Sequence, residues 1–362
     1  MIESIPSMAD ALRLTRSGDL RGATRLIQMS LSGRAASREA DQDQRASDVT
    51  TPYLTLALPG LAPASPPRPL MPEAERGSGL FEDRDYIGAE GRMGYRLYLP
   101  AGATDGMPLA IMLHGCTQTP EDFALGTGMN DLADEMGFIV AYPRQTTAAN
   151  VQRCWNWFKP GDQQRGKGEP ALIAAVTRRI VSEFNADANR IYVAGLSAGG
   201  AAAAIMGATY PDIYAAIGVH SGLACGAARD MPSAFAAMRG GPSHRTGDAK
   251  AARVVPVITF HGDKDTTVAE VNSAHIVASA ERDSKATLRS LKETGGLAGQ
   301  RSFTRETSCD SDGKIWIERW TIHGAGHAWS GGHAPGSYTD ERGPDASRAM
   351  MTFFLQHSLA NG

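Results

Sequence analysis

One serine in the sequence lies in a pattern that suits a nucleophile. Residues 195–199 (GLSAG) match G-x-S-x-G, which by itself is a common pattern. The apolar run RIYVA precedes the match and the helix-forming run SAGGAAAAIMGA follows it, so Ser197 is predicted to lie on a turn between a strand and a helix. Gly195, Gly199 and Gly200 would let the two elements approach closely. We predict a serine nucleophile for acyl transfer, and the alternative is a glycine-rich turn with a capping serine.

A serine hydroxyl needs a base to take its proton, and the base needs an acid to orient it. For a nucleophile on a strand–turn–helix, the acid and then the histidine come later in the chain. The segment HGDKDTTV follows the apolar run VPVITF. We choose Asp265 because it lies deeper in this loop, whereas Asp263 could pin the turn. The predicted base is His327, in the loop GAGHAWSGG after the last apolar run, and His323 is assigned a structural role.

Acyl transfer also needs N–H donors aimed at the oxygen that gains negative charge. The backbone N–H of Ala198, directly after the nucleophile, is one predicted donor. The loop after the run MPLAIML supplies the other, and we select the N–H of Cys116. The Cys116 thiol as nucleophile is the rival interpretation, but no base is indicated for it. The sequence has no HExxH motif and no convincing ligand spacing of His and carboxylates, so we expect neither a catalytic metal nor another cofactor.

Short apolar runs alternate with helical stretches from about residue 79 onward. DYIGAE and GYRLYLP predict a β-hairpin, and KIWIERWTIHG predicts a late strand. The other predicted strands are MPLAIMLHG, GFIVAYP, RIYVAGLS, YAAIGVHS and VPVITFHGD, and the predicted helices are ALGTGMNDLADEMG, EPALIAAVTRRIVSEFN, SAGGAAAAIMGATYP and PDASRAMMTFFLQHSL. Near-continuous apolar strands between helices predict an α/β catalytic domain over residues 79–362, with a mostly parallel sheet covered on both faces. Catalytic residues then gather at the carboxyl ends of the strands.

Two segments of different character precede this domain. Residues 1–33 predict a short amphipathic helical hairpin, and residues 34–78 predict a Pro- and Ala-rich linker. We expect the hairpin to pack on the main domain or on a second copy of the chain, which would give a homo-oligomer. A granule or membrane-surface anchor is the alternative. The N-terminus lacks a basic region followed by an apolar one, which predicts a cytoplasmic protein, with an extracellular one as the alternative.

Composition excludes several classes of protein. The chain has 362 residues with 36 Lys and Arg against 39 Asp and Glu, a net charge of −3. Such a chain has no general electrostatic attraction to nucleic acid or to an anionic membrane. No run approaches the roughly 18 apolar residues of a membrane span. Glycine is enriched, at 40 residues, and part of the excess lies in the predicted strand-end turns.

Five strings in order resemble the esterases of the polyhydroxybutyrate (PHB) depolymerase family, in the α/β-hydrolase superfamily. They are LHGCTQTPEDF, QRCWNWF, GLSAGGAAAA, HGDKDTTV and GAGHAWSGG. The resemblance covers about residues 79–357. It implies the α/β-hydrolase fold, the Ser–Asp–His triad and oxyanion donors chosen above, and hydrolysis of short-chain hydroxyalkanoate esters. Related sequences act on feruloyl and acetyl esters, so an esterase of that kind is the alternative. A non-catalytic granule-binding protein is a third interpretation.

The resemblance also suggests which residues bind the substrate. Trp155 and Trp157 alternate in CWNWF, so an extended segment would place both on one face. Trp329 lies two residues past the predicted base, and His114 opens the predicted oxyanion loop. These four form the predicted substrate-binding set, because tryptophans can line an acyl groove with apolar area. Core packing is the alternative for the first two.

Four cysteines are too few and too scattered for a disulfide scaffold. Cys116 and Cys154 lie in loops expected near the site, and a disulfide between them would suit an oxidising compartment. A pairing of Cys225 with Cys309 is left open. Secreted depolymerases that attack solid polymer carry a further linker and a C-terminal binding module. This sequence ends shortly after its final helix, so we expect poor attack on crystalline polymer.

Overall fold

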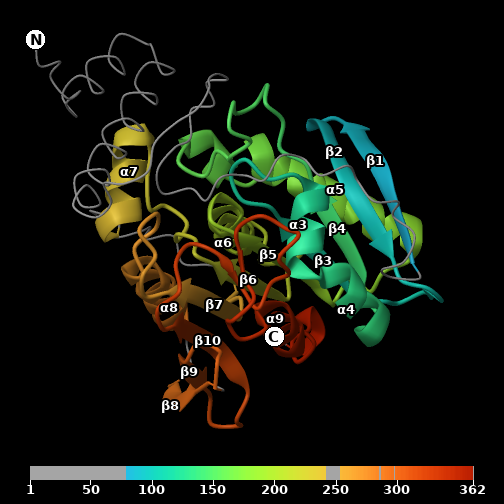
Figure 1. Ribbon diagram of the computed structural model, residues 1–362. Coiled ribbons are helices and arrows are strands. Elements are labelled where there is room, and N and C mark those ends of the chain that lie inside the picture. The colour runs from blue at the N-terminus through green and yellow to red at the C-terminus, as the bar shows by residue number, and fades with distance from the viewer. Residues whose placement is uncertain (1–78, 242–252, 285–286, 297, 362) are drawn as a thin grey trace, which may run out of the picture. The chain divides into compact units, whose positions relative to one another are not determined.

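The computed structural model describes residues 79–241, 253–284, 287–296 and 298–361 (Figure 1). The predicted N-terminal helices and linker, residues 1–78, lie outside the described residues. Ten strands form one sheet in the order β1-β2-β4-β3-β5-β6-β7-β10-β9-β8. Among the described residues, no helix is both long and apolar enough to cross a membrane.

The six central strands of the sheet run parallel, and five of them are buried along their whole length. Both faces of these strands are covered, which explains why they read as continuous apolar runs. The predicted mostly parallel sheet is therefore confirmed. The central strands are β3 (Leu109–Leu113), β4 (Ile139–Pro143), β5 (Ile191–Leu196), β6 (Ala216–His220), β7 (Val257–Gly262) and β10 (Ile315–Ile322).

Antiparallel strands extend the sheet at both ends, blue and orange in Figure 1. The predicted hairpin is confirmed as β1 (Leu80–Gly88) and β2 (Gly91–Leu99), with β2 antiparallel to β4. At the far end, β9 (Phe303–Cys309) pairs with β10, and β8 (Arg289–Gly295) is the edge strand. The sequence analysis predicted neither β8 nor β9. The polar side chains of β8 are almost all exposed and give no buried face. A separate pair joins β11 (Trp329–Ser330) to β12 (Thr339–Asp340).

Alternate side chains of each central strand enter two core clusters, one on each face of the sheet. In β3, Leu109, Ile111 and Leu113 pack with one set of helices, whereas Ala110 and Met112 pack with the other. The first set is α5 (Gly168–Phe184), α6 (Ala198–Thr209), α7 (Met231–Gly240) and α8 (Val271–Asp283). The second set is α3 (Pro120–Thr127), α4 (Met129–Met136) and α9 (Ala346–Phe354). Helices therefore cover both faces, as predicted.

The stretch predicted to be helical over residues 124–137 is helical, but it is divided between the end of α3 and α4 by a break. Gly128, at φ 62°, ends one helix and precedes the other. A glycine in this left-handed conformation is a common helix terminus. The first helix also begins earlier than predicted, at Pro120, where the Thr119 side chain accepts a hydrogen bond from the Asp122 N–H.

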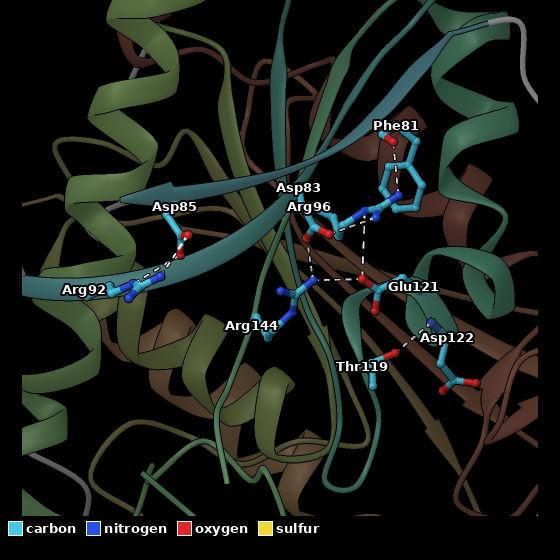
Figure 2. A network of polar contacts seen from close by, with 9 residues as sticks. All are labelled: Phe81, Asp83, Asp85, Arg92, Arg96, Thr119, Glu121, Asp122 and Arg144. Carbon is cyan, nitrogen blue, oxygen red and sulfur yellow. Dashed lines mark hydrogen bonds and ion pairs between the residues drawn. The ribbon is translucent and has the colours of Figure 1, made fainter. Parts of the chain in front are cut away.

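A network of charges fastens α3 to the antiparallel end of the sheet (Figure 2). Arg144, after β4, contacts Asp83 of β1 at 2.6 Å and Glu121 of α3 at 2.8 Å. Arg96 of β2 reaches the same two carboxylates at 3.3 and 3.9 Å, and its guanidinium lies 4.1 Å above the Phe81 ring. Because α3 follows directly after the predicted oxyanion loop, this network helps to fix where that loop leaves the sheet.

Replacing Arg96 with alanine should lower the free energy of unfolding by about 1–3 kcal/mol. Its side chain is only 12% exposed and loses both aromatic packing and charged partners. Arg92→Ala is the matched control on the same strand, because that side chain is 69% exposed and pairs with Asp85. The control should lose no more than about 0.5 kcal/mol in a urea titration. Equal losses for the two variants would contradict this account of the network.

Candidate active site

Ser197 lies on the turn between β5 and α6, where the flanking sequence placed it. Its backbone has φ 58° and ψ −117°, a conformation that an L-residue adopts only when its surroundings impose it. A Cβ atom at Gly199 would lie 1.9 Å from the Leu113 carbonyl oxygen, so only glycine fits at that position. The strain and the close approach together form the sharp turn that presents a serine hydroxyl at the end of a strand.

The predicted acid and base meet across two paired strands. Asp265 follows β7 and His327 follows β10, and these strands are neighbours in the sheet. His327 Nδ1 lies 2.6 Å from Asp265 Oδ2, and the carboxylate side chain is completely buried. The other carboxylate oxygen accepts hydrogen bonds from the N–H groups of Thr267 and Val268, both at 2.9 Å. The pair thus orients the imidazole with Nδ1–H on the carboxylate and leaves Nε2 to act as a base.

A second histidine, which the sequence analysis did not single out, also contacts this carboxylate. His261 Nε2 lies 3.4 Å from Asp265 Oδ2 and donates a hydrogen bond to the Val268 carbonyl oxygen at 2.8 Å. Burial alone would raise the pKa of Asp265, but the hydrogen bonds from His261 and His327 hold the pKa of this carboxyl well below its usual range. The group therefore stays ionised and can stabilise a positive charge that forms on His327.

The alternative acid, Asp263, is engaged elsewhere. Its carboxylate contacts His323 Nδ1 at 3.1 Å and accepts a hydrogen bond from the Gly324 N–H at 2.8 Å. Burial opposes ionisation, but these bonds lower the pKa of Asp263. The structure thus brings Asp265, not Asp263, to His327. Although two Asp–His pairs adjoin, no group of three or more His, Cys, Asp or Glu side chains in the described part of the chain could hold a metal ion.

His220, at the end of β6, links the nucleophile turn to the histidine loop. Its carbonyl oxygen accepts a hydrogen bond from the Ser197 N–H at 2.8 Å, and its Nε2 accepts one from the Ser330 N–H at 2.9 Å. The ring is buried and stacks on Trp329 and Phe260, with ring centroids 5.0 and 5.8 Å away. Desolvation holds its pKa well below the usual value, so the ring stays neutral and its Nε2 can accept. The sequence analysis did not single out this residue.

The structure does not join the serine directly to the histidine. No hydrogen bond connects Ser197 Oγ with His327 in the described residues, so their contact stays a prediction. Catalytic hydrogen bonds are often long in the absence of substrate. Through His220, however, the two loops share one buried anchor, which fixes the nucleophile turn relative to the segment that follows the base.

The two predicted oxyanion donors are unused amides. In the described residues the N–H groups of Cys116 and Ala198 have no acceptor. The amides on either side of Cys116 are engaged, since Gly115 N–H donates to a glutamine side chain at 2.8 Å and Thr117 N–H to a backbone carbonyl at 2.6 Å. The Ala198 N–H is free because it lies in the first turn of α6, where helix amides lack an intrahelical acceptor. Free N–H donors of this kind are what an oxyanion hole requires. Their role stays a prediction.

A disulfide joins the oxyanion loop to the loop between β4 and the short helix η1 (Pro160–Gln163). It links Cys116 to Cys154, with 4.2 Å between their Cα atoms. A sulfur in a disulfide offers no thiolate, so the structure gives no support to the Cys116 thiol as a nucleophile. Cys225 and Cys309 are free, and the pairing left open between them is not formed. Burial raises the pKa of the Cys225 thiol to about 11, which makes it a poor nucleophile.

The four residues predicted to bind substrate lie inside the protein. Trp155 and His114 are fully buried, and Trp155 Nε1–H donates to the His114 carbonyl oxygen at 3.0 Å. Trp329 is 1% exposed and donates to a serine hydroxyl, and Trp157 is 7% exposed within a core cluster. Because their surfaces are covered by protein, these side chains support the loops of the site rather than line an open groove. For Trp155 and Trp157, the core-packing alternative describes their positions better.

More than half of the chain matches a known protein family. The matched residues are 93–295, and the family is described as "Esterase PHB depolymerase". The chain belongs to this family. It is 31% identical over 246 residues to Poly(3-hydroxyalkanoate) depolymerase C of Paucimonas lemoignei. The aligned region covers 64% of this chain and 57% of that protein. It is 35% identical over 128 residues to Feruloyl esterase B of Neurospora crassa, and this aligned region covers 35% of this chain and 43% of that protein. The chain thus spans about half the length of the curated relatives it matches.

A solved structure supports the fold. The acetyl xylan esterase from Aspergillus awamori superposes with a TM-score of 0.59 at 20% identity, over 77% of this chain and 100% of that one. At this identity the likeness bears on the fold alone. The predicted α/β-hydrolase fold and the predicted family are both confirmed.

Replacing His220 with phenylalanine should lower kcat about 10- to 100-fold on a p-nitrophenyl ester, with little change in KM. The aromatic stack survives, but the buried Ser330 N–H loses its acceptor, which costs about 1–3 kcal/mol and frees the histidine loop. His357→Phe is the matched control, because His357 is also buried and its ring nitrogens have no partner in the described residues. The control should keep kcat near that of the wild type. A normal kcat in His220→Phe would contradict the positioning role.

Proposed function

We propose that this chain is a serine esterase that hydrolyses carboxylic esters through an acyl-enzyme. The observation that carries the proposal is the 2.6 Å contact between the buried Asp265 carboxylate and His327. These residues follow β7 and β10, which run parallel to β5 in the same sheet, and the strained Ser197 turn follows β5. In the first half-reaction, His327 Nε2 takes the proton of Ser197 Oγ as that oxygen attacks the ester carbonyl carbon. The N–H groups of Cys116 and Ala198 bind the oxyanion. The bond to the alcohol oxygen then breaks, and His327 protonates the leaving alcohol.

In the second half-reaction, water replaces the alcohol. His327 takes a proton from the water, whose oxygen attacks the acyl carbon, and the carboxylic acid leaves as the proton returns to Ser197 Oγ. Asp265 remains ionised throughout and stabilises the imidazolium form of His327 in both halves. Its lowered pKa and the backbone N–H groups that donate to its carboxylate support this assignment.

Short-chain hydroxyalkanoate esters, such as 3-hydroxybutyrate oligomers or polyester, are the proposed substrates. Family membership supports this choice, as does the relative from Paucimonas lemoignei that is a poly(3-hydroxyalkanoate) depolymerase. A feruloyl or acetyl-xylan esterase activity on the same triad is the second candidate, supported by the feruloyl esterase relative. Comparing turnover of 3-hydroxybutyrate oligomers, methyl ferulate and acetylated xylan separates the two.

The cellular compartment and the assembly state belong to this proposal. The cytoplasm is the proposed compartment. The Cys116–Cys154 disulfide supports the extracellular alternative, because such bonds persist mainly in oxidising compartments. A homo-oligomer formed through residues 1–33 is proposed on their amphipathic pattern alone.

Replacing Ser197 with alanine should reduce kcat/KM on p-nitrophenyl butyrate by at least about three orders of magnitude, since the proposed mechanism forms the acyl-enzyme on Ser197 Oγ. Ser182→Ala is the control, because Ser182 is an exposed residue of α5. It should keep the activity of the wild type when both variants are purified in parallel. Undiminished hydrolysis by Ser197→Ala would overturn the proposed mechanism.

A further inference from the structure

Three strained residues gather beside the predicted oxyanion loop. Thr117, Arg153 and Tyr338 have φ values of 67°, 54° and 54°, in the left-handed region that non-glycine residues seldom occupy. The described residues contain only three other non-glycine residues with positive φ, and two of these are Ser197 and Ser221 at strand ends of the same site. Strained backbone concentrates where function requires a particular geometry. We call Thr117, Arg153 and Tyr338 the rim cluster.

The members of the rim cluster come from three separate loops and contact one another. The Arg153 guanidinium donates a hydrogen bond through Nη2 to the Thr117 carbonyl oxygen at 2.7 Å. Thr117 Oγ1 lies 3.2 Å from the Tyr338 hydroxyl. Both contacts are exposed, so solvent or a ligand can reach these groups. The cluster therefore presents one cation and two hydroxyls at the surface.

The rim cluster is close to the reacting atoms along the chain. Thr117 directly follows Cys116, and Arg153 directly precedes Cys154, its disulfide partner. Two residues of backbone span at most about 7 Å, which bounds the separation of the Cys116 N–H and the Thr117 carbonyl oxygen. The hydrogen bond from Arg153 then places its Nη2 within about 10 Å of the predicted oxyanion donor. A short ester bound at Ser197 can reach that far.

The charge of Arg153 is not neutralised by a carboxylate in the described residues. Other arginines at this end of the sheet are paired, such as Arg144 with Asp83 and Glu121. Arg153 instead uses one of its five N–H groups on a backbone carbonyl. A guanidinium held in place and lacking an acid partner is suited to bind a carboxylate, because its planar fork matches two carboxylate oxygens.

We propose that the rim cluster binds the free carboxylate of a short hydroxyacid oligoester, with Arg153 as the charged contact and the hydroxyls of Thr117 and Tyr338 as further donors. This inference rests on the proposed esterase function and narrows its substrate class. In a dimer of 3-hydroxybutyrate, the carboxylate lies on the alcohol side of the ester. Cleavage breaks the bond between the acyl carbon and the alcohol oxygen, His327 protonates that oxygen, and the departing hydroxyacid carries the carboxylate away.

The assignment distinguishes the two candidate substrate classes. Methyl ferulate and an acetylated neutral sugar bring no carboxylate to the rim cluster, whereas every linear hydroxyalkanoate oligomer ends in one. The preference should be strongest for dimers and trimers, whose carboxylate lies near the scissile ester, and it should fade with chain length. Raising the ionic strength should also reduce it, because salt screens an exposed pair of charges.

The test compares the 3-hydroxybutyrate dimer with its methyl ester. The wild type should have a higher kcat/KM for the free acid, and Arg153→Gln should reduce the acid-to-methyl-ester ratio about tenfold, the low end of what a charged hydrogen bond contributes. Arg153→Lys should retain part of the preference, and Tyr338→Phe should reduce it less. Arg165→Gln is the matched control, because Arg165 also donates to a backbone carbonyl but is paired with Asp212. Its ratio should equal that of the wild type.

A ratio that is unchanged in Arg153→Gln and Arg153→Lys overturns the proposal, and so does a wild type with no preference for the acid.

Calorimetric binding of the dimer to Ser197→Ala separates this proposal from the esterase proposal, since binding needs no turnover. Tight binding of the acid over its methyl ester, lost on adding Arg153→Gln, supports the rim cluster even if no ester is cleaved. Equal binding of the two compounds contradicts it even if the enzyme is an active esterase. Thermal unfolding of each variant shows whether it folds. If the Arg153 variants do not fold, the acid-to-methyl-ester ratio of Tyr338→Phe decides the test.

Discussion

The buried carboxylate of Asp265 is the group on which the arrangement of the site depends. It accepts two backbone N–H bonds within its own loop and contacts two imidazoles, His327 and His261. A buried charge without such partners would be strongly unfavourable, so the loops after β7 and β10 are held together as long as the group is ionised. The same contacts that keep the carboxylate charged also fix the orientation of the base. Stability and chemistry therefore depend on the same group.

Buried aromatic and histidine side chains fix the loops at neighbouring strand ends relative to one another. His220 accepts from Ser330 and stacks on Trp329, and its carbonyl fixes the Ser197 amide. Trp155 fixes the His114 carbonyl beneath the oxyanion loop. These residues need no contact with substrate to matter, because an oxyanion hole and a base act only when they are held in place before the reaction. The disulfide adds a covalent link between the two loops that carry Thr117 and Arg153.

The features that could be predicted from the sequence are those that depend on residues close together in the chain. Continuous apolar runs gave the parallel strands, and the flanking runs placed Ser197 on its turn, because those signals depend on neighbours in the chain. The choice of Asp265 over Asp263 agrees with the geometry, although the sequence offered only loop position as a reason. Burial of Trp155 and Trp329 could not be read from their spacing, since a tryptophan suits a core as well as a groove. His220 and Arg153 depend on contacts between distant loops, which no local pattern records.

The central claim is that Asp265 and His327 activate Ser197 and no other nucleophile. Labelling with a fluorophosphonate, followed by mass spectrometry of the peptides, tests this most directly because the reagent captures the activated hydroxyl without needing the natural ester. The account predicts one adduct, on the peptide containing Ser197, and a labelling rate in Asp265→Asn that is lower by about three to four orders of magnitude. Label on a different residue, or an equal rate in Asp265→Asn, would contradict it.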